Sequence, residues 1–207
     1  MIEVDHLVFT APSLPEGQDY IEQRLGIRPV HSGHHPQLGT ETALLGIGPR
    51  MYLEVIAMAG DTMPTDKRLP FGLQTCSAPH LATWCARGQN FAAINMRLEQ
   101  AGVSLGAMRE GQRQTPNCKL LTWTFTDIYQ DRLDGIVPFF IKWGDTHPSD
   151  TLPNGGQLTT LSIRHPSPAP LNQLSDVLPP EVDIEDGTHT ELRAEIRLPD
   201  NRLIWLG

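Results

Sequence analysis

Residues 3–26, EVDHLVFTAPSLPEGQDYIEQRLG, decide the fold of this chain. Residues 3–11 are rich in Val, Leu and Phe, which is typical of a β-strand. Ser13 can cap a helix that follows, and Gly26 can end it. The helix has one apolar face, made of Leu14, Ile21 and Leu25. The stretch therefore predicts a strand followed by an amphipathic helix.

The same order of elements recurs along the chain. Three further strands complete the first unit, at residues 27–30, 42–47 and 51–57. Within this unit, residues 31–39 are predicted to form a loop. New strands begin near residues 80 and 158, and each is followed by a helical pattern and more strands. In the second unit, residues 110–117 are predicted to form a polar loop.

We predict an α+β fold built from repeated βαβββ modules. The first module spans residues 1–59 and the second spans residues 79–144, with residues 60–78 as a connecting segment. The two modules are expected to pair around a cleft. A third, shorter βαβββ-like module spans residues 156–207, either packed beside the pair or used in a dimer.

Composition restricts the partners of the protein. The formal net charge is -8, which argues against nucleic acid or an anionic membrane as the main partner. No apolar run reaches the roughly 18–20 residues that span a bilayer, and residues 1–5 do not resemble a signal peptide. Cys76, Cys85 and Cys118 have neither disulfide-framework nor zinc-knuckle spacing. We therefore expect a cytoplasmic protein with a small-molecule ligand.

Several stretches resemble a known family, the glyoxalase-like domain branch of the vicinal oxygen chelate superfamily. The stretches that carry the resemblance are residues 5–9, 33–40, 52–57, 138–144 and 163–166. The resemblance covers nearly the whole chain and implies paired modules around a ligand cleft. It leaves the reaction open, because the superfamily includes isomerases, dioxygenases, epimerases, thiol transferases and drug-sequestering proteins.

His6 and Glu54 are the first candidate metal ligands, and Glu54 is also a candidate catalytic carboxylate. Alternate side chains of a strand share a face, so Glu54 faces the concave side if Leu53 and Val55 pack under the helix. An imidazole and a carboxylate from two strands could hold a divalent ion with open positions for substrate oxygens. By analogy with the superfamily, such an ion would polarise a carbonyl or stabilise an enediolate.

Both residues also have a structural interpretation. By strand alternation His6 shares a face with Val4 and Val8, and it could be a core histidine bonded to a backbone carbonyl. A carboxylate inside an apolar strand needs a partner, which for Glu54 could be an arginine in a structural ion pair.

The second module offers fewer ligands. Superfamily enzymes usually take a His from its first strand and a Glu from its last. His80 can serve as a metal ligand only if its strand carries a bulge or a register shift, because Thr83 matches His6 when both are counted from the following helix. Ile141 stands at the position that matches Glu54. The fourth ligand of the glyoxalase I pattern is therefore absent.

The remaining candidates lie near the expected cleft. His34 and His35 belong to the predicted loop, where His34 could bind substrate and His35 could be a general base or a third ligand. Thr40 and Thr42 could offer hydroxyls to a ligand, and Trp84 could line an apolar pocket. Solvent exposure for the histidines, and strand or core packing for the others, are the structural alternatives.

These observations favour a glyoxalase-like small-molecule enzyme that uses a divalent metal on a substrate with neighbouring oxygens, as a lyase, isomerase or dioxygenase. A non-catalytic protein that binds small molecules or sequesters drugs is the alternative, which Thr83 and Ile141 favour. An interaction module whose extra repeat builds an oligomer, such as a homodimer, is a third possibility.

Overall fold

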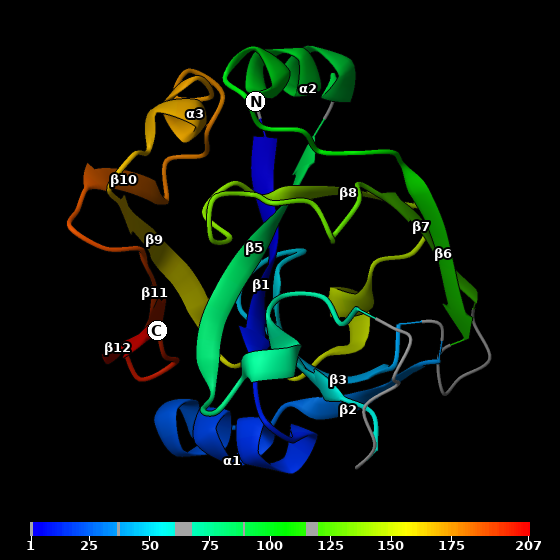
Figure 1. Cartoon of the computed structure of the whole chain (residues 1–207). Coiled ribbons are helices and arrows are strands. Elements are labelled where there is room, and N and C mark those ends of the chain that lie inside the picture. Colours follow the sequence, from blue (N-terminus) through cyan, green and yellow to red (C-terminus); the bar gives the residue numbers. More distant parts are fainter. Residues whose placement is uncertain (1, 37, 61–67, 89, 115–119) are drawn as a thin grey trace.

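The computed structural model of the chain describes residues 2–36, 38–60, 68–88, 90–114 and 120–207. Eight strands form one curved sheet in the order β2-β3-β4-β1-β5-β8-β7-β6, and four form a second sheet in the order β10-β9-β11-β12 (Figure 1). The predicted α+β fold with paired modules is confirmed. None of the helices in these ranges has the length and apolar character that crossing a bilayer requires.

The first module forms one half of the large sheet. Its elements are β1 (Ile2–Thr10), α1 (Leu14–Leu25), β2 (Val30–His35), β3 (Thr40–Gly46) and β4 (Tyr52–Met58). As predicted, the Ser13 hydroxyl accepts a hydrogen bond from the backbone of Glu16, and Gly26 ends α1 in the left-handed conformation. The predicted loop at 31–39 is wrong over residues 31–35, which form β2. Three histidines and a glycine are poor strand formers, but an edge strand needs only one partner and tolerates polar side chains.

The second module forms the other half. Its elements are β5 (His80–Gly88), α2 (Phe91–Gln100), β6 (Arg109–Gln114), β7 (Leu120–Phe125) and β8 (Phe139–Trp143), preceded by the 3-10 turn η1 (Leu73–Thr75). The antiparallel pairing of β1 with β5 joins the two modules into one sheet. Most of the predicted loop at 110–117 is wrong, because residues 110–114 lie in the edge strand β6. The rest of that loop and Cys118 lie outside the described residues.

The third segment has the predicted order of elements but a different pairing. It follows the 3-10 turn η2 (Pro148–Thr151) and contains β9 (Gln157–His165), α3 (Ala169–Asn172), β10 (Val182–Asp186), β11 (Glu191–Arg197) and β12 (Leu203–Leu206). In the first two modules the first strand pairs in parallel with the last one, whereas β9 pairs in parallel with β10. The four-residue helix α3 is only about 6 Å long, whereas α1 is about 18 Å long. Because α3 is short, the chain returns beside β9 and forms β10 there. The third segment therefore repeats the order of elements of the first two modules but not their strand pairing.

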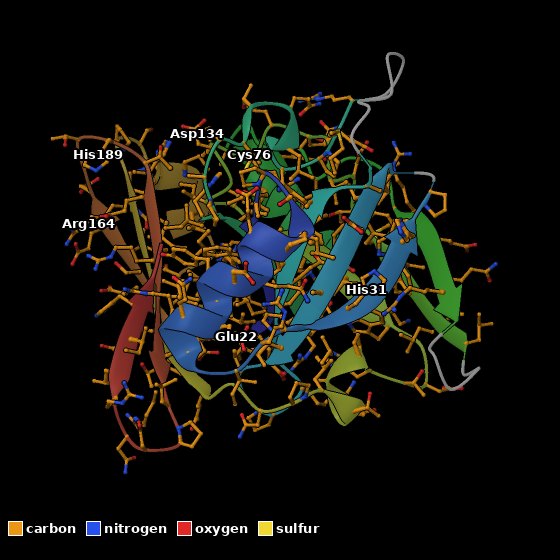
Figure 2. All side chains as sticks on the ribbon, turned by 90° about the horizontal axis from the view of Figure 1, so that it is seen from below. Glu22, His31, Cys76, Asp134, Arg164 and His189 are labelled. Atoms are coloured by element: carbon orange, nitrogen blue, oxygen red, sulfur yellow. The ribbon has the colours of Figure 1, made fainter. Side chains whose placement is uncertain are left out.

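The outer face of the large sheet carries the main core. Leu53 and Val55 pack beneath α1, as predicted, and share one hydrophobic cluster with residues of the second sheet such as Leu161. Gly17 lets α1 approach β4, because a Cβ there would lie 2.5 Å from a methyl group of Val55. Figure 2 shows α1 lying beside the small sheet. The third segment thus packs beside the paired modules, one of the two arrangements expected.

The inner face of the large sheet encloses a smaller apolar cluster, which includes Val8, Ile56, Cys85, Phe139 and Ile141. The sheet curls so far that its two edge strands meet. Arg113 on β6 donates a hydrogen bond to the backbone carbonyl of Ser32 on β2. This side-chain contact links the two edge strands.

Candidate functional site

The concave face holds a cavity of about 100 Å³. Its charged or titratable side chains include His6, Glu54 and Arg113, which come from three different strands, β1, β4 and β6. Most of the remaining lining is apolar or aromatic, including Tyr52, Phe71, Trp123, Phe139 and Trp143. A few polar groups converging inside an apolar cavity are typical of a ligand site.

A bulge in β1 brings His6 to the cavity. The pairing of β1 with β5 shifts register between Val4 and His6, which leaves Asp5 as the extra residue. Val4 therefore packs in the outer core with Leu7, while His6 faces inward. The expectation that Val4 and His6 share a face is wrong for this reason. Because of the bulge, the consecutive side chains of Asp5 and His6 contact each other and both contribute to the site.

The ring of His6 is fixed on all sides. Nδ1 lies 2.8 Å from Oδ1 of Asp5, and Nε2 lies 3.8 Å from Oε2 of Glu54. Tyr52 stacks on the ring with centroids 4.5 Å apart, and Phe139 meets it edge-on at 5.4 Å. Because the ionised Asp5 can only accept a hydrogen bond, it holds the proton on Nδ1 and directs the lone pair of Nε2 toward Glu54.

Asp5 is completely buried and surrounded by donors. Its carboxylate receives His147 Nε2 at 3.3 Å, Arg87 Nη1 at 3.2 Å and Trp143 Nε1 at 3.2 Å, besides His6. Burial alone would raise the pKa of this carboxyl. The hydrogen bonds from His147 and His6 and their charges outweigh burial and hold the pKa well below its usual range. Asp5 is thus a fixed negative charge behind His6.

Glu54 lies opposite His6 with only 17% of its side chain exposed. Burial raises its pKa, while the charges of His6 and Arg113 act in the opposite direction. Burial likewise lowers the pKa of Arg113, and Glu54 and Tyr52 favour its charged form. The site therefore combines a carboxylate of raised proton affinity with a nearby guanidinium.

Two more predicted residues line the cavity, and two lie close by. Thr42 and His35 are on its wall. Burial lowers the pKa of His35 to about 4, with the charges of Arg113 and His34 adding to the effect, so this imidazole is neutral at pH 7. His34 is 60% exposed, faces Glu41 at 3.9 Å and lines an outer groove. Thr40 is buried, and in the described part of the chain its hydroxyl has no hydrogen-bond partner.

Two predicted site residues lie elsewhere. His80 pairs with Thr10 at the start of β5, four residues along β1 from His6, which corresponds to about 13 Å. Its exposed ring bonds to the hydroxyl of Thr10 at 3.2 Å. Trp84 is fully buried on the outer face beside Leu7, and its indole N–H donates to the carbonyl of Ile136 at 2.8 Å. His80 lies far from His6 because β5 runs antiparallel to β1, so the start of β5 lies beside the end of β1. Trp84 lies on the outer face because successive side chains of a strand alternate between the two faces.

Strand register identifies Cys85 as the counterpart of His6 in the second module. His6 pairs with Tyr52, two residues before Glu54, and Cys85 pairs with Phe139, two residues before Ile141. Cys85 also lies directly opposite His6 across the β1–β5 pair. The expectation that Thr83 matches His6 is therefore wrong, because helix-based counting ignores the register of the strands. Burial raises the pKa of the Cys85 thiol well above its usual value, so it is protonated.

Sequence reasoning missed three contributors to the site. Asp5 could have been found from its place beside His6, since two adjacent polar residues in an apolar strand signal a bulge. Arg113 carried no local signal, because its role depends on the curl of the sheet. Cys85 was considered for its spacing from the other cysteines, which does not reveal its place opposite His6.

The donor set fits one divalent ion. A carboxylate behind the histidine is the arrangement that usually orients a metal-bound imidazole. The 3.8 Å between Nε2 of His6 and Oε2 of Glu54 allows both atoms to lie about 2.1 Å from one ion. Asp5, His6 and Cys85 also offer ligand atoms within 4.8 Å of one another. Ile141 supplies no donor, so the remaining positions of such an ion would be open to substrate oxygens.

Comparison with known proteins places this geometry in a family. The model of the glyoxalase-like domain matches residues 4–178. The chain belongs to the glyoxalase-like domain family. This confirms the resemblance found in the sequence, and the fold agrees with that of the vicinal oxygen chelate superfamily. No curated protein matches the sequence.

One solved structure shares the fold over the whole chain. A hypothetical protein from Staphylococcus aureus matches 100% of this chain and 99% of its own with a TM-score of 0.67 and 15% identity. Methylmalonyl-CoA epimerase from Mycobacterium tuberculosis matches 68% of this chain and 85% of its own, with a TM-score of 0.42 and 18% identity. The Streptomyces coelicolor methylmalonyl-CoA epimerase (S115T) matches 70% of this chain and 96% of its own, with a TM-score of 0.45 and 13% identity. Similarity at the level of the two epimerases supports no inference about activity.

Proposed function

We propose that this glyoxalase-like protein is a small-molecule enzyme that moves a proton at the carbon next to a substrate carbonyl. The substrate would carry neighbouring oxygens. The observation that carries the proposal is the pair formed by Nε2 of His6 and Oε2 of Glu54, 3.8 Å apart inside an apolar cavity. Arg113 lines the same cavity and supplies a positive charge.

Glu54 is the proposed base. Burial raises the pKa of its carboxyl toward the working range, which makes proton transfer in both directions easier. His6 presents Nε2 because Asp5 holds the proton on Nδ1. Arg113 would bind a substrate carboxylate or stabilise the negative oxygen that develops when the proton leaves.

A divalent ion is part of the proposal. His6 and Glu54 would hold it, and when bound it would polarise the neighbouring oxygens of the substrate. His35 is neutral near pH 7 and stands on the cavity wall, so it could accept a proton from a substrate hydroxyl.

The cavity is small, but a larger space lies next to it. An outer groove of about 900 Å³ shares lining residues with the cavity, including His35, Trp123 and Trp143. We expect the reacting end of the substrate to enter the cavity and the rest of the molecule to lie in the groove.

The test is hydrogen exchange. Wild-type protein is incubated in D₂O with small 2-oxo acids and other carboxylic acids that carry an acyl group, with and without added divalent metal. Proton NMR then follows the loss of the signal from the C–H next to the carbonyl. We expect E54Q to exchange about 10²–10⁴-fold more slowly than wild type. The control is E41Q, the same change on the neighbouring strand β3 outside the cavity, which should keep wild-type rates.

Folding of E54Q is checked in the same experiment. The ionised form of Glu54 costs stability at neutral pH, since burial raises its folded pKa. E54Q should therefore be at least as stable as wild type at pH 7, with the advantage vanishing below the unfolded pKa of about 4.3. Equal exchange rates in E54Q and wild type would refute the role of Glu54.

A binding protein without catalysis is the second candidate. The observation in its favour is that the second module lines the cavity mainly with apolar side chains such as Phe125, Phe139 and Ile141. Elemental analysis of untagged protein purified without chelator separates the two. Stoichiometric metal that is lost in H6A supports the enzyme, whereas metal-free protein that binds an aromatic ligand and catalyses no exchange supports the binding protein.

A further inference from the structure

A second groove lies beside the cavity. It has a volume of about 650 Å³ and is lined by residues 68–72, the start of β5 and residues 128–132, among others. Phe71 and Ile128 line both this groove and the cavity. The two spaces are therefore neighbours that share a wall of two apolar side chains.

Arg132 lines this groove with unused hydrogen-bonding capacity. Only 5% of the residue is exposed. Nη1 donates to the carbonyl of Asp127 at 3.4 Å, while the buried Nε has no hydrogen-bond partner among the residues that the structure describes. The guanidinium lies 5.9 Å and 5.5 Å from the ring centroids of Phe71 and Phe139, respectively. Within the described ranges, no carboxylate forms an ion pair with it.

Among the described residues, the charges of Asp127 and Asp131 act on Arg132, but neither carboxylate forms an ion pair with this buried positive charge. Burial lowers the pKa of Arg132 to about 10, so the side chain remains charged at neutral pH. Taking such a charge out of water is costly unless it is paired, and two cation–π contacts offset only part of that cost. An anion in the groove would supply the missing partner.

The acidic residues of the groove do not fill this role. Asp131 and Asp134 also line it, but both are exposed at its rim and have other partners. Asp131 accepts the backbone N–H of Leu133 at 3.0 Å, and Asp134, labelled in Figure 2, accepts the hydroxyl of Thr190 at 3.0 Å.

We propose that this groove is an anion-binding site in which the guanidinium of Arg132 binds a carboxylate or a phosphate group. Guanidinium groups favour both anions, because their planar N–H donors match two oxygens at once. Arg68, which is exposed and lines the same groove, adds positive charge at the entrance. The proposal is independent of the chemistry assigned to His6 and Glu54.

The probes are inorganic phosphate and malonate, titrated separately into the full-length protein by calorimetry and by thermal unfolding at constant ionic strength. Wild type should bind at least one of them saturably, and the stronger of the two identifies the group that the groove prefers. In R132Q, which keeps the size and polarity of the side chain but removes the charge, binding should weaken by about tenfold or more. The control R202Q removes an exposed arginine that pairs with Asp200, and it should bind like wild type.

A second variant keeps the test decisive if R132Q does not fold. R68Q changes an exposed side chain at the entrance and should weaken binding about threefold without affecting folding. Crystals of wild type grown in selenate provide a direct measurement, with anomalous density expected against Arg132. Absence of saturable binding in wild type, unchanged binding in a folded R132Q, or selenate only at other arginines would overturn the proposal.

Discussion

Asp5 connects the reactive histidine to the rest of the protein. Its carboxylate accepts hydrogen bonds from His6, His147, Arg87 and Trp143. A buried carboxylate with four donors keeps a single position, and it imposes that position on the imidazole that it touches. The orientation of Nε2 of His6 toward Glu54 is thus built into the folded protein rather than acquired with the ligand.

Replacing Asp5 by Asn tests this network. D5N should lower the free energy of unfolding at pH 7 by roughly 3–5 kcal/mol, because Arg87 loses a buried counter-charge and the histidines lose their acceptor. The folded pKa of Asp5 lies below its unfolded value, so its contribution is complete above about pH 4 and is lost as pH falls further. The difference between wild type and D5N should therefore shrink below pH 4. Urea unfolding across this pH range measures it.

The matched control for D5N is E3Q. Glu3 also lies on β1 and pairs with Arg87, but its side chain is 65% exposed. Exposed ion pairs contribute little, so E3Q should change the free energy of unfolding by less than about 1 kcal/mol. A D5N protein as stable as E3Q at pH 7, or one with the pH dependence of wild type, would contradict the assigned role.

Two of the site residues were predictable from sequence and others were not. Glu54 lies between Leu53 and Val55, so simple alternation places it on the concave face, and the structure confirms that placement. His6 reaches the same face only through the bulge at Asp5. Alternation counted from Val4, which packs in the outer core, would place His6 on the outer face. The sequence could not show the bulge, because a bulge depends on pairing with another strand.

At the scale of elements, the edge strands are where sequence patterns fail. β2 and β6 consist mostly of polar residues, such as His34 and Arg113, and were predicted as loops. Edge strands face solvent on one side and have a single neighbour, so an apolar alternation is not required of them. The central strands β1, β4 and β5 are buried on both faces, and their apolar runs were predicted correctly.

Replacing Trp84 tests whether the outer face of β5 contributes to stability but not to ligand binding. The side chain is fully buried in the outer core, and its indole donates to the carbonyl of Ile136. W84F removes that donor and leaves a void, so we expect a loss of roughly 2–4 kcal/mol in the free energy of unfolding. Since the cavity lies on the other face, the affinity for a cavity ligand and the exchange rate per folded molecule should be unchanged.

The matched change on the inner face is W143F. Trp143 lines the cavity and donates to Asp5, so its replacement should weaken ligand binding as well as stability. Urea unfolding and ligand titration of the two variants give the comparison. A loss of ligand affinity in W84F equal to that in W143F would show that the two faces are not functionally separate.

At the scale of the whole molecule, the repeat predicted the pairing of two modules but not the closure of their sheet. The two edge strands meet where Arg113 of β6 donates to Ser32 of β2, and this contact also places Arg113 in the cavity. Nothing local to either segment indicates that contact. The third segment shows the same limit, because its order of elements repeats while its strand pairing does not.

The small sheet is part of the fold rather than an appendage. Its buried residues Leu161, Ile163 and Ile196 share one hydrophobic cluster with Leu7 on the outer face of the large sheet. Backbone bonds also cross between the parts, from Ile2 N–H to the carbonyl of Val177 at 2.9 Å. Exposing one large apolar side chain lowers the free energy of unfolding by about 1.5–3 kcal/mol. The loss from several such side chains therefore exceeds the stability of a typical domain.

A chain that ends at residue 152 should therefore not fold. The intact chain should unfold in urea in a single cooperative transition followed by circular dichroism and tryptophan fluorescence, because one core serves both sheets. The truncated chain should show no such transition and should bind a hydrophobic dye, because the outer face of the large sheet is exposed. As a milder change in the full chain, Leu161→Ala should cost roughly 2–5 kcal/mol and preserve the single transition. Cooperative unfolding of the truncated chain would instead make the paired modules an independent domain, and the site at His6 and Glu54 would then be expected to work without the small sheet.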